Sequence, residues 1–560
     1  MKKSIRNLAL VLALLMLAAG LSACKGSETT ESPPPAQPEQ SAQPAQPSQP
    51  AQSAQPGADS ATIGEISTVE TNPDEHEMSD ETLRVVLDEE PNVLTPQYSS
   101  PSSPGMTIGT AIFDSLFRWN RETKTADPCL ATGYEWIDTT HLRLFLRQGV
   151  IGHDGKEMTA DDVLFTIEFG TSGTNTNYTR LFVLDDCRVE DDYTFVLALP
   201  NPYPNIVDIL CSEAYGIISR SATAAVGGIE AGTRTTKIGF GRYTFDSWVS
   251  GQYIRLVRHD AYWDTEKVPY FKYVDFTWNL DTATRSMAIQ SGDADVTFNL
   301  TATQLNNMST MDGISVFGGP SDSGLSLWMN CKNEALSDER VREAISLLVD
   351  RDAVVNLIYG GYTLATDTLV TQLSKYYSAP KQQPVRDAAR AKALLDEAGY
   401  GNGITFNCMI VAKNSNLAEL LQANLAEGGV NLDISTVEFP VMMGTLMGGE
   451  YEMYLTDLPG NDPARLLIRI DGRLPIPAAA GGAQYNSDEL NALIDTALYD
   501  PDESLRIAAY GDIQDYVRQN HVQVGICSEI CSAAFSSDLT GVGFCPSYFP
   551  DISNVRPIGK

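Results

Sequence analysis

The chain has 560 residues, 43% of them hydrophobic, and its 72 acidic and 39 basic side chains give a formal net charge of −33. This length predicts several domain-sized units with large apolar cores, which excludes a disordered chain or a small disulfide scaffold. The excess of acid argues against the basic face that nucleic acids and anionic lipids require, so we expect no nucleic-acid partner.

The N-terminus carries the pattern of an export signal. Basic residues within the first six positions precede an apolar run over 8–20, which is too short to span a bilayer. The run ends in Leu-Ser-Ala-Cys at 21–24, which resembles a bacterial lipobox, the signal for diacylation of Cys24. We therefore predict a signal peptide over 1–23 and a lipid anchor on Cys24; secretion without an anchor is the alternative.

A low-complexity segment follows the predicted anchor. Residues 24–81 are rich in Pro, Gln, Ala and Ser and have little apolar surface to bury. Such a composition favours extended, polyproline-like conformations at about 3 Å per residue. We predict a spacer that holds a folded region away from the membrane.

Cysteine usage leaves two alternatives open. Lipidation of Cys24 would leave eight cysteines, and export permits disulfides, but their spacing does not indicate a pairing. Free buried thiols are the other alternative. Cys527 and Cys531 are the only close pair and, with His521, could instead hold a soft metal ion.

Helix and strand patterns alternate from residue 82 onward, which predicts a mixed α/β fold. The expected helices lie over 108–119, from the capping residue Thr159 onward, from Ser337 onward and over 385–398. The expected strands lie over 83–87, 141–147, 253–257, 271–278, 325–329, 404–410 and 432–437.

Five segments, in order and at consistent spacing, resemble bacterial extracellular solute-binding proteins of family 5, the peptide/nickel-type receptors of ABC importers. The first segment contains Leu-Arg-Gln-Gly-Val over 146–150, His-Asp-Gly over 153–155 and Thr-Ala-Asp-Asp-Val over 159–163. The second contains Gly-Phe-Gly-Arg-Tyr over 239–243 and Ala-Tyr-Trp over 261–263, and the third is Ser-Gly-Asp-Ala-Asp over 291–295. The fourth contains Asp-Glu-Arg-Val-Arg over 338–342 and Asp-Arg at 350–351, and the fifth spans 391–400.

The resemblance implies a two-lobed, periplasmic-binding-protein-like clamp of type II, cluster C, with an extra N-terminal subdomain at about 116–184. Lobe one would comprise 82–278 with a return over 523–560, and lobe two would comprise 279–522. A small solute would bind in the interlobe cleft of a monomer, without a cofactor, for delivery to an ABC permease and its ATPase subunits. We expect the chain on the extracytoplasmic face of the cell membrane, at the surface of a Gram-positive-type bacterium rather than in a periplasm.

The resemblance also indicates candidate ligand-binding residues. Peptide-binding members carry a tryptophan and, three residues later, an aspartate that pairs with the peptide ammonium group. Here the aligned positions hold Thr456 and Pro459, so the neighbouring Asp457 is the candidate substitute. Tyr98 and Ser99 match the family's first cleft-lining loop.

Other functions remain as alternatives. The departures at 456 and 459 keep open a non-peptide solute such as a nickel or other metal chelate, an opine or a saccharide. A secreted hydrolase is a remote alternative, because the sequence has no P-loop, serine-hydrolase elbow or zinc-ligand spacing. We therefore predict no enzyme activity, no catalytic residues and no metal site, and we expect Arg342, Asp350, Tyr262 and Trp263 to be scaffold.

Overall fold

The computed structural model describes most of the chain beyond the predicted spacer. The described residues are 78–98, 104–172, 176–234, 237–368, 370–381, 385–458, 463–476, 481–545 and 548–559. The predicted signal peptide, Cys24 and nearly all of the predicted spacer lie outside these residues.

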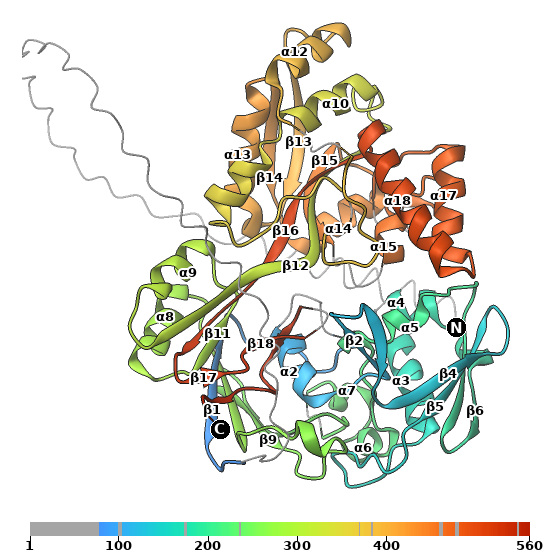
Figure 1. The fold of residues 1–560 in the computed structure, drawn as a ribbon, viewed down its shortest axis with the longest axis vertical. Helices are drawn as coiled ribbons and strands as arrows, with labels where there is room; N and C mark the ends of the chain where they lie inside the picture. Colours follow the sequence, from blue (N-terminus) through green and yellow to red (C-terminus); the bar gives the residue numbers. More distant parts are fainter. Residues whose placement is uncertain are drawn as a thin grey trace, which may run out of the picture. The chain divides into compact units, whose positions relative to one another are not determined.

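A mixed sheet of ten strands dominates the fold (Figure 1), with the order β14-β13-β15-β12-β16-β11-β1-β10-β9-β8. Its strands are β1 (Thr82–Leu87), β8 (Tyr243–Val249), β9 (Tyr253–Arg258), β10 (Tyr273–Trp278), β11 (Val296–Phe298), β12 (Ile314–Met329), β13 (Ile404–Ile410), β14 (Val430–Thr436), β15 (Met453–Leu458) and β16 (Gln523–Ser536).

The strands β12 and β16 link the two halves of this sheet. They have 16 and 14 residues and pair antiparallel from Ile314↔Ser536 to Trp328↔Gln523. β15 pairs with one end of β12, whereas β11 pairs with the opposite end of β16. In Figure 1 the two strands run side by side through the middle of the sheet. Residues roughly 200 positions apart in the sequence therefore meet along them.

Smaller sheets surround the first part of the chain. A four-stranded sheet has the order β4-β5-β7-β6, and three two-stranded ribbons pair β2 with β3, β17 with β20 and β18 with β19. Their bounds are β2 (Phe117–Asn120), β3 (Thr125–Pro128), β4 (Ala131–Trp136), β5 (His141–Leu146), β6 (Arg188–Asp191), β7 (Thr194–Ala198), β17 (Leu539–Thr540), β18 (Gly543–Phe544), β19 (Pro550–Asp551) and β20 (Arg556–Pro557).

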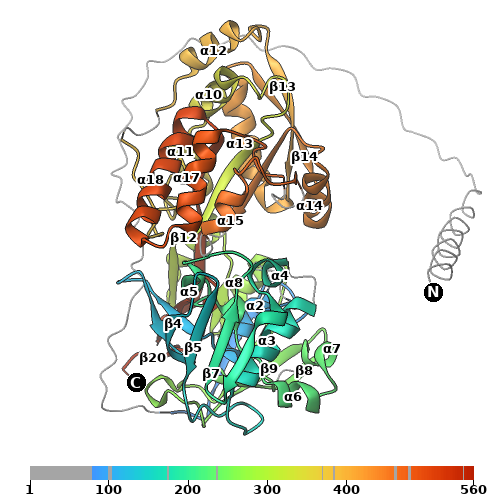
Figure 2. The same ribbon diagram turned by 90° about the vertical axis from the view of Figure 1, so that its right-hand side faces the viewer.

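Helices cover the sheets on the outside. Figure 2 shows α17 beside α18, and α3 beside β7 of the four-stranded sheet. The helices are α2 (Pro104–Ile112), α3 (Ala160–Ser172), α4 (Thr176–Leu181), α5 (Ile206–Ile209), α6 (Arg220–Ala225), α7 (Ile229–Gly232), α8 (Thr282–Ser291), α9 (Ala302–Ser309), α10 (Glu339–Leu348), α11 (Arg351–Ala353), α12 (Ala388–Glu397), α13 (Ser415–Ala426), α14 (Phe439–Gly448), α15 (Pro463–Ile468), α17 (Asp488–Tyr499) and α18 (Glu503–Asn520). Short helical turns are η1 (Leu184–Asp186), η2 (Glu213–Tyr215), η3 (Thr265–Lys267), the π-helical η4 (Val354–Ile358) and η5 (Ala412–Asn414).

The periodicity of the sequence predicted several of these elements. The expected strand over 404–410 is β13, and the alternating leucines of β5 are buried at 142, 144 and 146. The helix expected over 108–119 is wrong in its second half, because α2 ends at Ile112 and Trp119 lies in β2. The chain turns at Asp114, which accepts hydrogen bonds from Arg118 and Tyr262 and so cannot sit on an apolar helical face.

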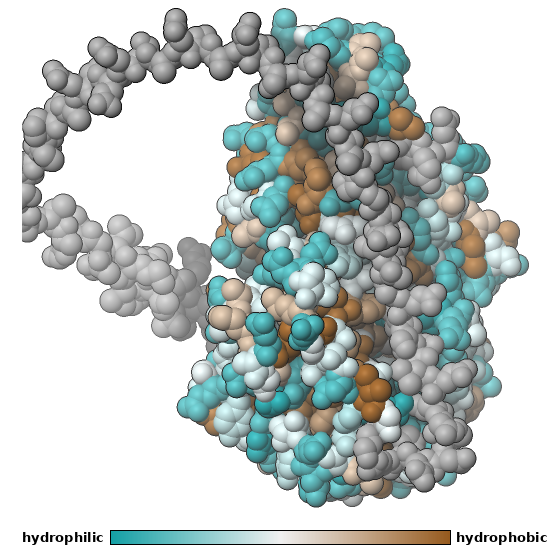
Figure 3. Space-filling view, turned by 60° about the vertical axis from the view of Figure 1, so that its left-hand side comes forward, coloured by the Kyte–Doolittle hydropathy of each residue, from teal (hydrophilic) through white to brown (hydrophobic). Residues whose placement is uncertain are grey.

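The face of the molecule shown in Figure 3 is mostly polar, as the composition predicts. On the face shown in Figure 3, hydrophilic residues predominate and hydrophobic residues form small separated patches. Among the described helices, none is both long and apolar enough to cross a bilayer.

Candidate functional site

A bulge in β12 creates the central feature of the candidate site. Pro320 pairs with Ile530 and Gly324 pairs with Ser528, so residues 321–323 all lie opposite Glu529 of β16. Extra residues in one strand bend it and redirect side chains, and such bulges often occur beside functional sites. Here the bulge projects Asp322 and Ser323 out of the regular pleat.

On one side of the bulge, two carboxylates share one ammonium group. Lys413 Nζ lies 2.8 Å from Asp457 Oδ1 and 3.2 Å from Glu529 Oε1. Ser323 Oγ donates to Asp457 Oδ2 at 3.3 Å. The side chains of Asp457 and Glu529 are 27% and 20% exposed, so solvent still reaches both carboxylates. We call these three ionisable side chains the Lys413 group.

The local charges set the protonation of the Lys413 group. Burial acts to raise the pKa of Asp457, but the adjacent Lys413 outweighs it, and the pKa of Asp457 falls below its ordinary value. Burial raises the pKa of Glu529, and the charge of Asp457 adds to this shift. Asp457 is therefore the more acidic of the two carboxylates.

Arg121, in the turn after β2, lies within electrostatic reach of Asp322 in the bulge. Its guanidinium lies 4.3 Å from the ring centre of Tyr548 and donates to the carbonyl of Cys545. Its Nε atom is buried and has no hydrogen-bond partner among the described residues. Burial raises the pKa of the nearby Asp322 to about 7, although the charge of Arg121 opposes this shift.

The predicted site residues do not all come together in the structure. Asp457 lies in β15, beside the bulge. Tyr98 instead contacts α3: its hydroxyl lies 3.1 Å from Ser172 Oγ, and its ring packs edge-on against Phe169. Ser99, Pro459 and Cys24 lie outside the described residues, so their predicted roles stay predictions.

The expected scaffold residues make internal contacts. Asp114 accepts hydrogen bonds from Tyr262 Oη at 2.6 Å and Trp263 Nε1 at 3.1 Å. Arg342 donates to the carbonyls of Leu336 and Ser337 and to that of Asn520 at the end of α18. These contacts give both motifs a structural function that needs no ligand.

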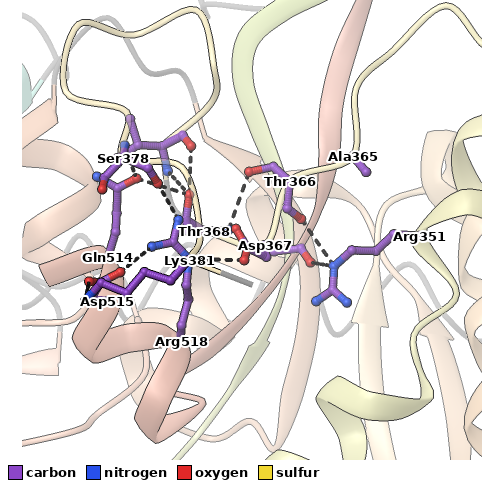
Figure 4. Close-up of polar contacts among 12 residues, drawn as sticks. Arg351, Ala365, Thr366, Asp367, Thr368, Ser378, Lys381, Gln514, Asp515 and Arg518 are labelled. Atoms are coloured by element: carbon purple, nitrogen blue, oxygen red, sulfur yellow. Dashed lines mark hydrogen bonds and ion pairs between the residues drawn. The ribbon is translucent and has the colours of Figure 1, made fainter. Parts of the chain in front are cut away.

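A polar network fixes the segment that follows η4 (Figure 4). Arg518 of α18 pairs with Asp367 at 3.1 Å and with Asp515 at 2.8 Å. Arg351 donates to the carbonyls of Thr366 and of Gly525 in β16. Because these groups come from α18, α11 and β16, they hold residues 366–368 and 370–381 against the part of the large sheet that contains β16.

The same segment also contacts α5, which precedes it by more than 150 residues in the sequence. Tyr376 Oη donates to Asn205 Oδ1 at 3.0 Å, and Lys375 Nζ lies 2.7 Å from Asp208 Oδ2 of α5. Arg506 of α18 also donates to Asn205 Oδ1, at 3.1 Å. We call these contacts the α5 clasp.

The cysteines and potential metal ligands make no special centre in the part of the chain described. All eight described cysteines are free, and seven of them are buried. Within the same residues, no group of three His, Cys, Asp or Glu side chains is arranged to hold a metal ion. Buried thiols, one of the two alternatives left by the sequence, thus describe these cysteines.

The sequence patterns missed Lys413, Glu529, Asp322 and Arg121. A signal existed for Glu529, because period-two alternation places it on the same face of β16 as Cys527 and Cys531. A carboxylate within so apolar a strand requires a partner. The partner, Lys413, is distant in sequence and could not be identified without the fold.

Comparisons with known proteins agree with this architecture. Residues 125–468 match the family model described as "Bacterial extracellular solute-binding proteins, family 5 Middle". The glutathione-binding protein GsiB of Pectobacterium atrosepticum is 24% identical over 467 residues, which are 80% of this chain and 89% of that protein.

Solved structures share the fold. NikA from Brucella suis, in complex with Fe(III)-EDTA, has a TM-score of 0.75 at 22% identity, covering 85% of this chain and 100% of that one. DppA from Helicobacter pylori, in complex with the peptide STSA, has a TM-score of 0.71 at 20% identity, covering 85% and 98%. The predicted α/β, two-lobed binding-protein fold is thereby confirmed. Since the family model matches more than half of the sequence, this chain belongs to the bacterial extracellular solute-binding proteins of family 5.

Proposed function

We propose that this protein captures peptides outside the cytoplasm and delivers them to an ABC permease and its ATPase subunits. Membership of family 5 supports the receptor role. The observation that carries the peptide assignment is the half-buried Lys413 group, in which Asp457 and Glu529 face a single ammonium group. Carboxylate oxygens with acceptor positions left over suit the ammonium end of a peptide, because a charge-assisted hydrogen bond gains strength in a partly desolvated site.

Asp457 is the proposed anchor for that ammonium group. It is the one of the two carboxylates whose pKa is lowered, so it remains charged while the solute binds. Ser323 orients its second oxygen. Tyr98 and Ser99 are proposed to line the entrance of the cleft, as the family pattern implies.

Lipid attachment completes the proposal. Diacylated Cys24 would hold the chain at the extracytoplasmic face of the membrane, and the Pro-rich spacer would let the receptor reach its permease. The lobes are proposed to comprise 82–278 with 523–560, and 279–522, closing over the solute by a hinge movement. A monomer suffices for this function.

Identification of the retained solute tests the proposal. The full-length chain is purified in detergent, denatured and analysed by mass spectrometry for released small molecules. Recovery of peptides supports the proposal, and recovery of a metal chelate, an opine or a sugar overturns the peptide assignment. A solute that the protein converts to a product would overturn the receptor role and support a hydrolase.

Binding measurements on an Asp457→Ala variant test the anchor. We expect its dissociation constant for a recovered peptide to rise roughly ten- to hundredfold, because one charge-assisted hydrogen bond is lost. Glu450→Ala, which removes an exposed carboxylate from the loop before β15, supplies a control. Unchanged affinity in Asp457→Ala would remove Asp457 from the site.

A further inference from the structure

The helix α14 has no charged side chain, although one of its faces is exposed. Its inner face packs Met442 and Leu446 into the core. On the other side, the side chains of Phe439, Val441 and Met447 are 55%, 57% and 45% exposed. The helix α2 is equally free of charge, but eight of its nine residues are buried. Since a surface helix normally turns a polar face to water, the exposed face of α14 calls for an apolar partner.

The described part of the chain leaves this face uncovered. A β-carbon added to Gly444 or Gly448 would meet no atom of another described segment within 4 Å. Figure 2 shows α14 beside β14 at the outer margin of the folded region, with α17 and α18 on the far side. The single hydroxyl of the helix, on Thr445, already donates to the carbonyl of Val441 at 3.1 Å. The face is therefore accessible and offers a partner apolar contact rather than hydrogen bonds.

The size and chemistry of this face distinguish between its possible occupants. Three half-exposed apolar side chains present roughly 300 Å² of surface, whereas each partner of a stable protein complex buries about 800 Å². A protein interface also forms about one hydrogen bond per 100–200 Å². A lipid surface requires neither a large area nor hydrogen bonds when a separate attachment holds the protein close to it.

Charge also favours α14 as the element that meets lipid. The chain has a formal net charge of −33, and an anionic membrane surface repels acidic side chains. Only α18 among the other described helices exposes two large apolar side chains, Leu505 and Ile507, and there Glu503 lies beside them. The ten residues of α14 are uncharged, and the nearest carboxylates, Glu438 and Glu450, flank the helix. Electrostatic repulsion is therefore weaker for α14 than for α18.

We propose that the exposed face of α14 lies on the outer surface of the lipid bilayer, with Phe439, Val441 and Met447 inserted among the lipid headgroups. This inference rests on the lipid attachment in the proposed function and extends it from tethering to orientation. The predicted spacer over 24–81, at about 3 Å per residue, is long enough for this contact. Because diacylated Cys24 would hold the chain near the bilayer, a weak contact by three side chains suffices.

A fluorescent dye on α14 tests the contact. The full-length chain is purified in detergent, reconstituted into phosphatidylcholine vesicles and labelled as Val441→Cys. Lipids with brominated acyl chains quench a dye that enters the bilayer. We expect them to lower the fluorescence at 441 by about half, because an interfacial helix buries its apolar face about 5–10 Å deep.

A second labelled position supplies the matched control. Leu505 is apolar and 51% exposed but lies on α18, so the dye on Leu505→Cys should be quenched by less than about a tenth. The wild-type chain, labelled in the same way, corrects for the native cysteines, of which seven of the eight described are buried.

Substitutions on the same face separate insertion from proximity. Adding Phe439→Ser and Met447→Ser to the labelled Val441→Cys chain removes most of the apolar surface, and we expect about fivefold less quenching. Adding Leu505→Ser instead should leave the quenching unchanged. If circular dichroism shows that the combined variant is unfolded, Met447→Ser alone replaces it and should lower the quenching about twofold.

The lipid composition checks the role of charge. Vesicles that contain anionic phosphatidylglycerol should quench the dye at 441 less, because the acidic chain is repelled from their surface. About 1 M salt should restore the quenching, because it screens this repulsion. Quenching that increases with anionic lipid would contradict an uncharged contact.

The outcomes distinguish this inference from the proposed function. A chain that does not float with the vesicles overturns both the lipid attachment and the contact through α14. A chain that floats, but whose dye at 441 is quenched no more than the dye at 505, overturns the contact and leaves the attachment intact. Energy transfer between dyes on two copies, or shielding that requires the permease in the vesicle, would assign the face to a protein partner and overturn the lipid contact.

Discussion

Several buried arginines in this protein are paired with backbone carbonyls. Arg342 and Arg351 each donate to the carbonyl of a distant segment, and Arg285 donates to the carbonyls of Asn279 and Leu280, just before its own helix. A guanidinium has five donors in a rigid plane, so a single residue can satisfy carbonyls that a helix end or a loop leaves unpaired. These arginines therefore hold elements together through hydrogen bonds rather than through ion pairs.

Arg342→Met tests this function. We expect the free energy of unfolding to fall by about 3 kcal/mol, because the carbonyls of Leu336, Ser337 and Asn520 lose their buried donor. Denaturation in urea measures the change. Arg340→Gln, on the exposed side of the same helix, should change it by less than about 0.5 kcal/mol; equal losses would contradict the assignment.

His153 makes stability depend on pH. Burial lowers the pKa of His153 to about 3, and the charge of His259 adds to this shift, whereas the charges of Asp114 and Asp154 oppose it. The Nε2 atom lies 3.0 Å from the Gly241 carbonyl oxygen. Since the pKa of an unfolded histidine is about 6.5, the unfolded state binds the proton more tightly, and stability is lost as pH falls from about 6.5 toward 3.

In His153→Gln, we expect the free energy of unfolding to vary less steeply between pH 6.5 and 4 than in the wild type. Chemical denaturation at several pH values measures the slope. At pH 8 the histidine is neutral in both the folded and the unfolded state. The difference in free energy of unfolding between the wild type and His153→Gln at this pH therefore reports the cost of the altered packing alone. If the slope of the free energy of unfolding against pH were unchanged in the variant, His153 would not contribute to the pH dependence of stability.

At the scale of elements, local signals predicted the fold better than the site. Period-two and helical patterns identified β5 and α10, because each buries one regular face. β13 was identified as a short apolar run, and its last three residues are all buried. The sequence pattern failed where tertiary contacts determine the structure. The hydrogen-bonded Asp114 lies just beyond the early end of α2. Gly318, Gly319 and Pro320 interrupt the apolar pattern of β12, so its first part was not predicted. The Lys413 group joins three segments distant in sequence, so no local pattern could predict it.

The N-cap of α12 permits a local test. Asp387 accepts a hydrogen bond from the backbone N–H of Arg390 at 2.8 Å, and Gly399 ends the same region at a φ of 91°. We expect Asp387→Ala to cost about 1 kcal/mol, because an N–H in the first turn loses its partner, whereas Asp387→Ser retains most of the stability. Hydrogen exchange of α12 measures the loss, and equal effects of the two substitutions would contradict capping.

At the scale of the molecule, the α5 clasp joins α5 to α18 and to the segment that holds Lys375 and Tyr376. These contacts are additional to the strand pairing within the large sheet. The ion pair of the clasp is largely buried, with Lys375 and Asp208 side chains 13% and 19% exposed. Burial raises the pKa of Asp208 above its ordinary value, and Lys375 opposes this shift. The network in Figure 4 holds the clasp segment in place on its other side.

Lys375→Met would leave Asp208 without its cation. If solute binds the state in which the clasp is made, opening it reduces the fraction of competent molecules, and we expect the peptide dissociation constant to rise roughly five- to tenfold. Calorimetry measures affinity, and small-angle scattering measures the accompanying expansion. Lys381→Met, which removes only an exposed partner of Asp515, is the control; identical affinities in the two variants would exclude a role for the clasp.

The buried free thiols make the chain a reporter of its own unfolding. Burial raises the pKa of Cys129 and Cys408 to about 12, so in the native state these sulfurs are both shielded and protonated. A thiol-reactive dye modifies only thiolates that it can reach. The rate at which the dye labels them would therefore count opening events of the native structure, without any engineered probe.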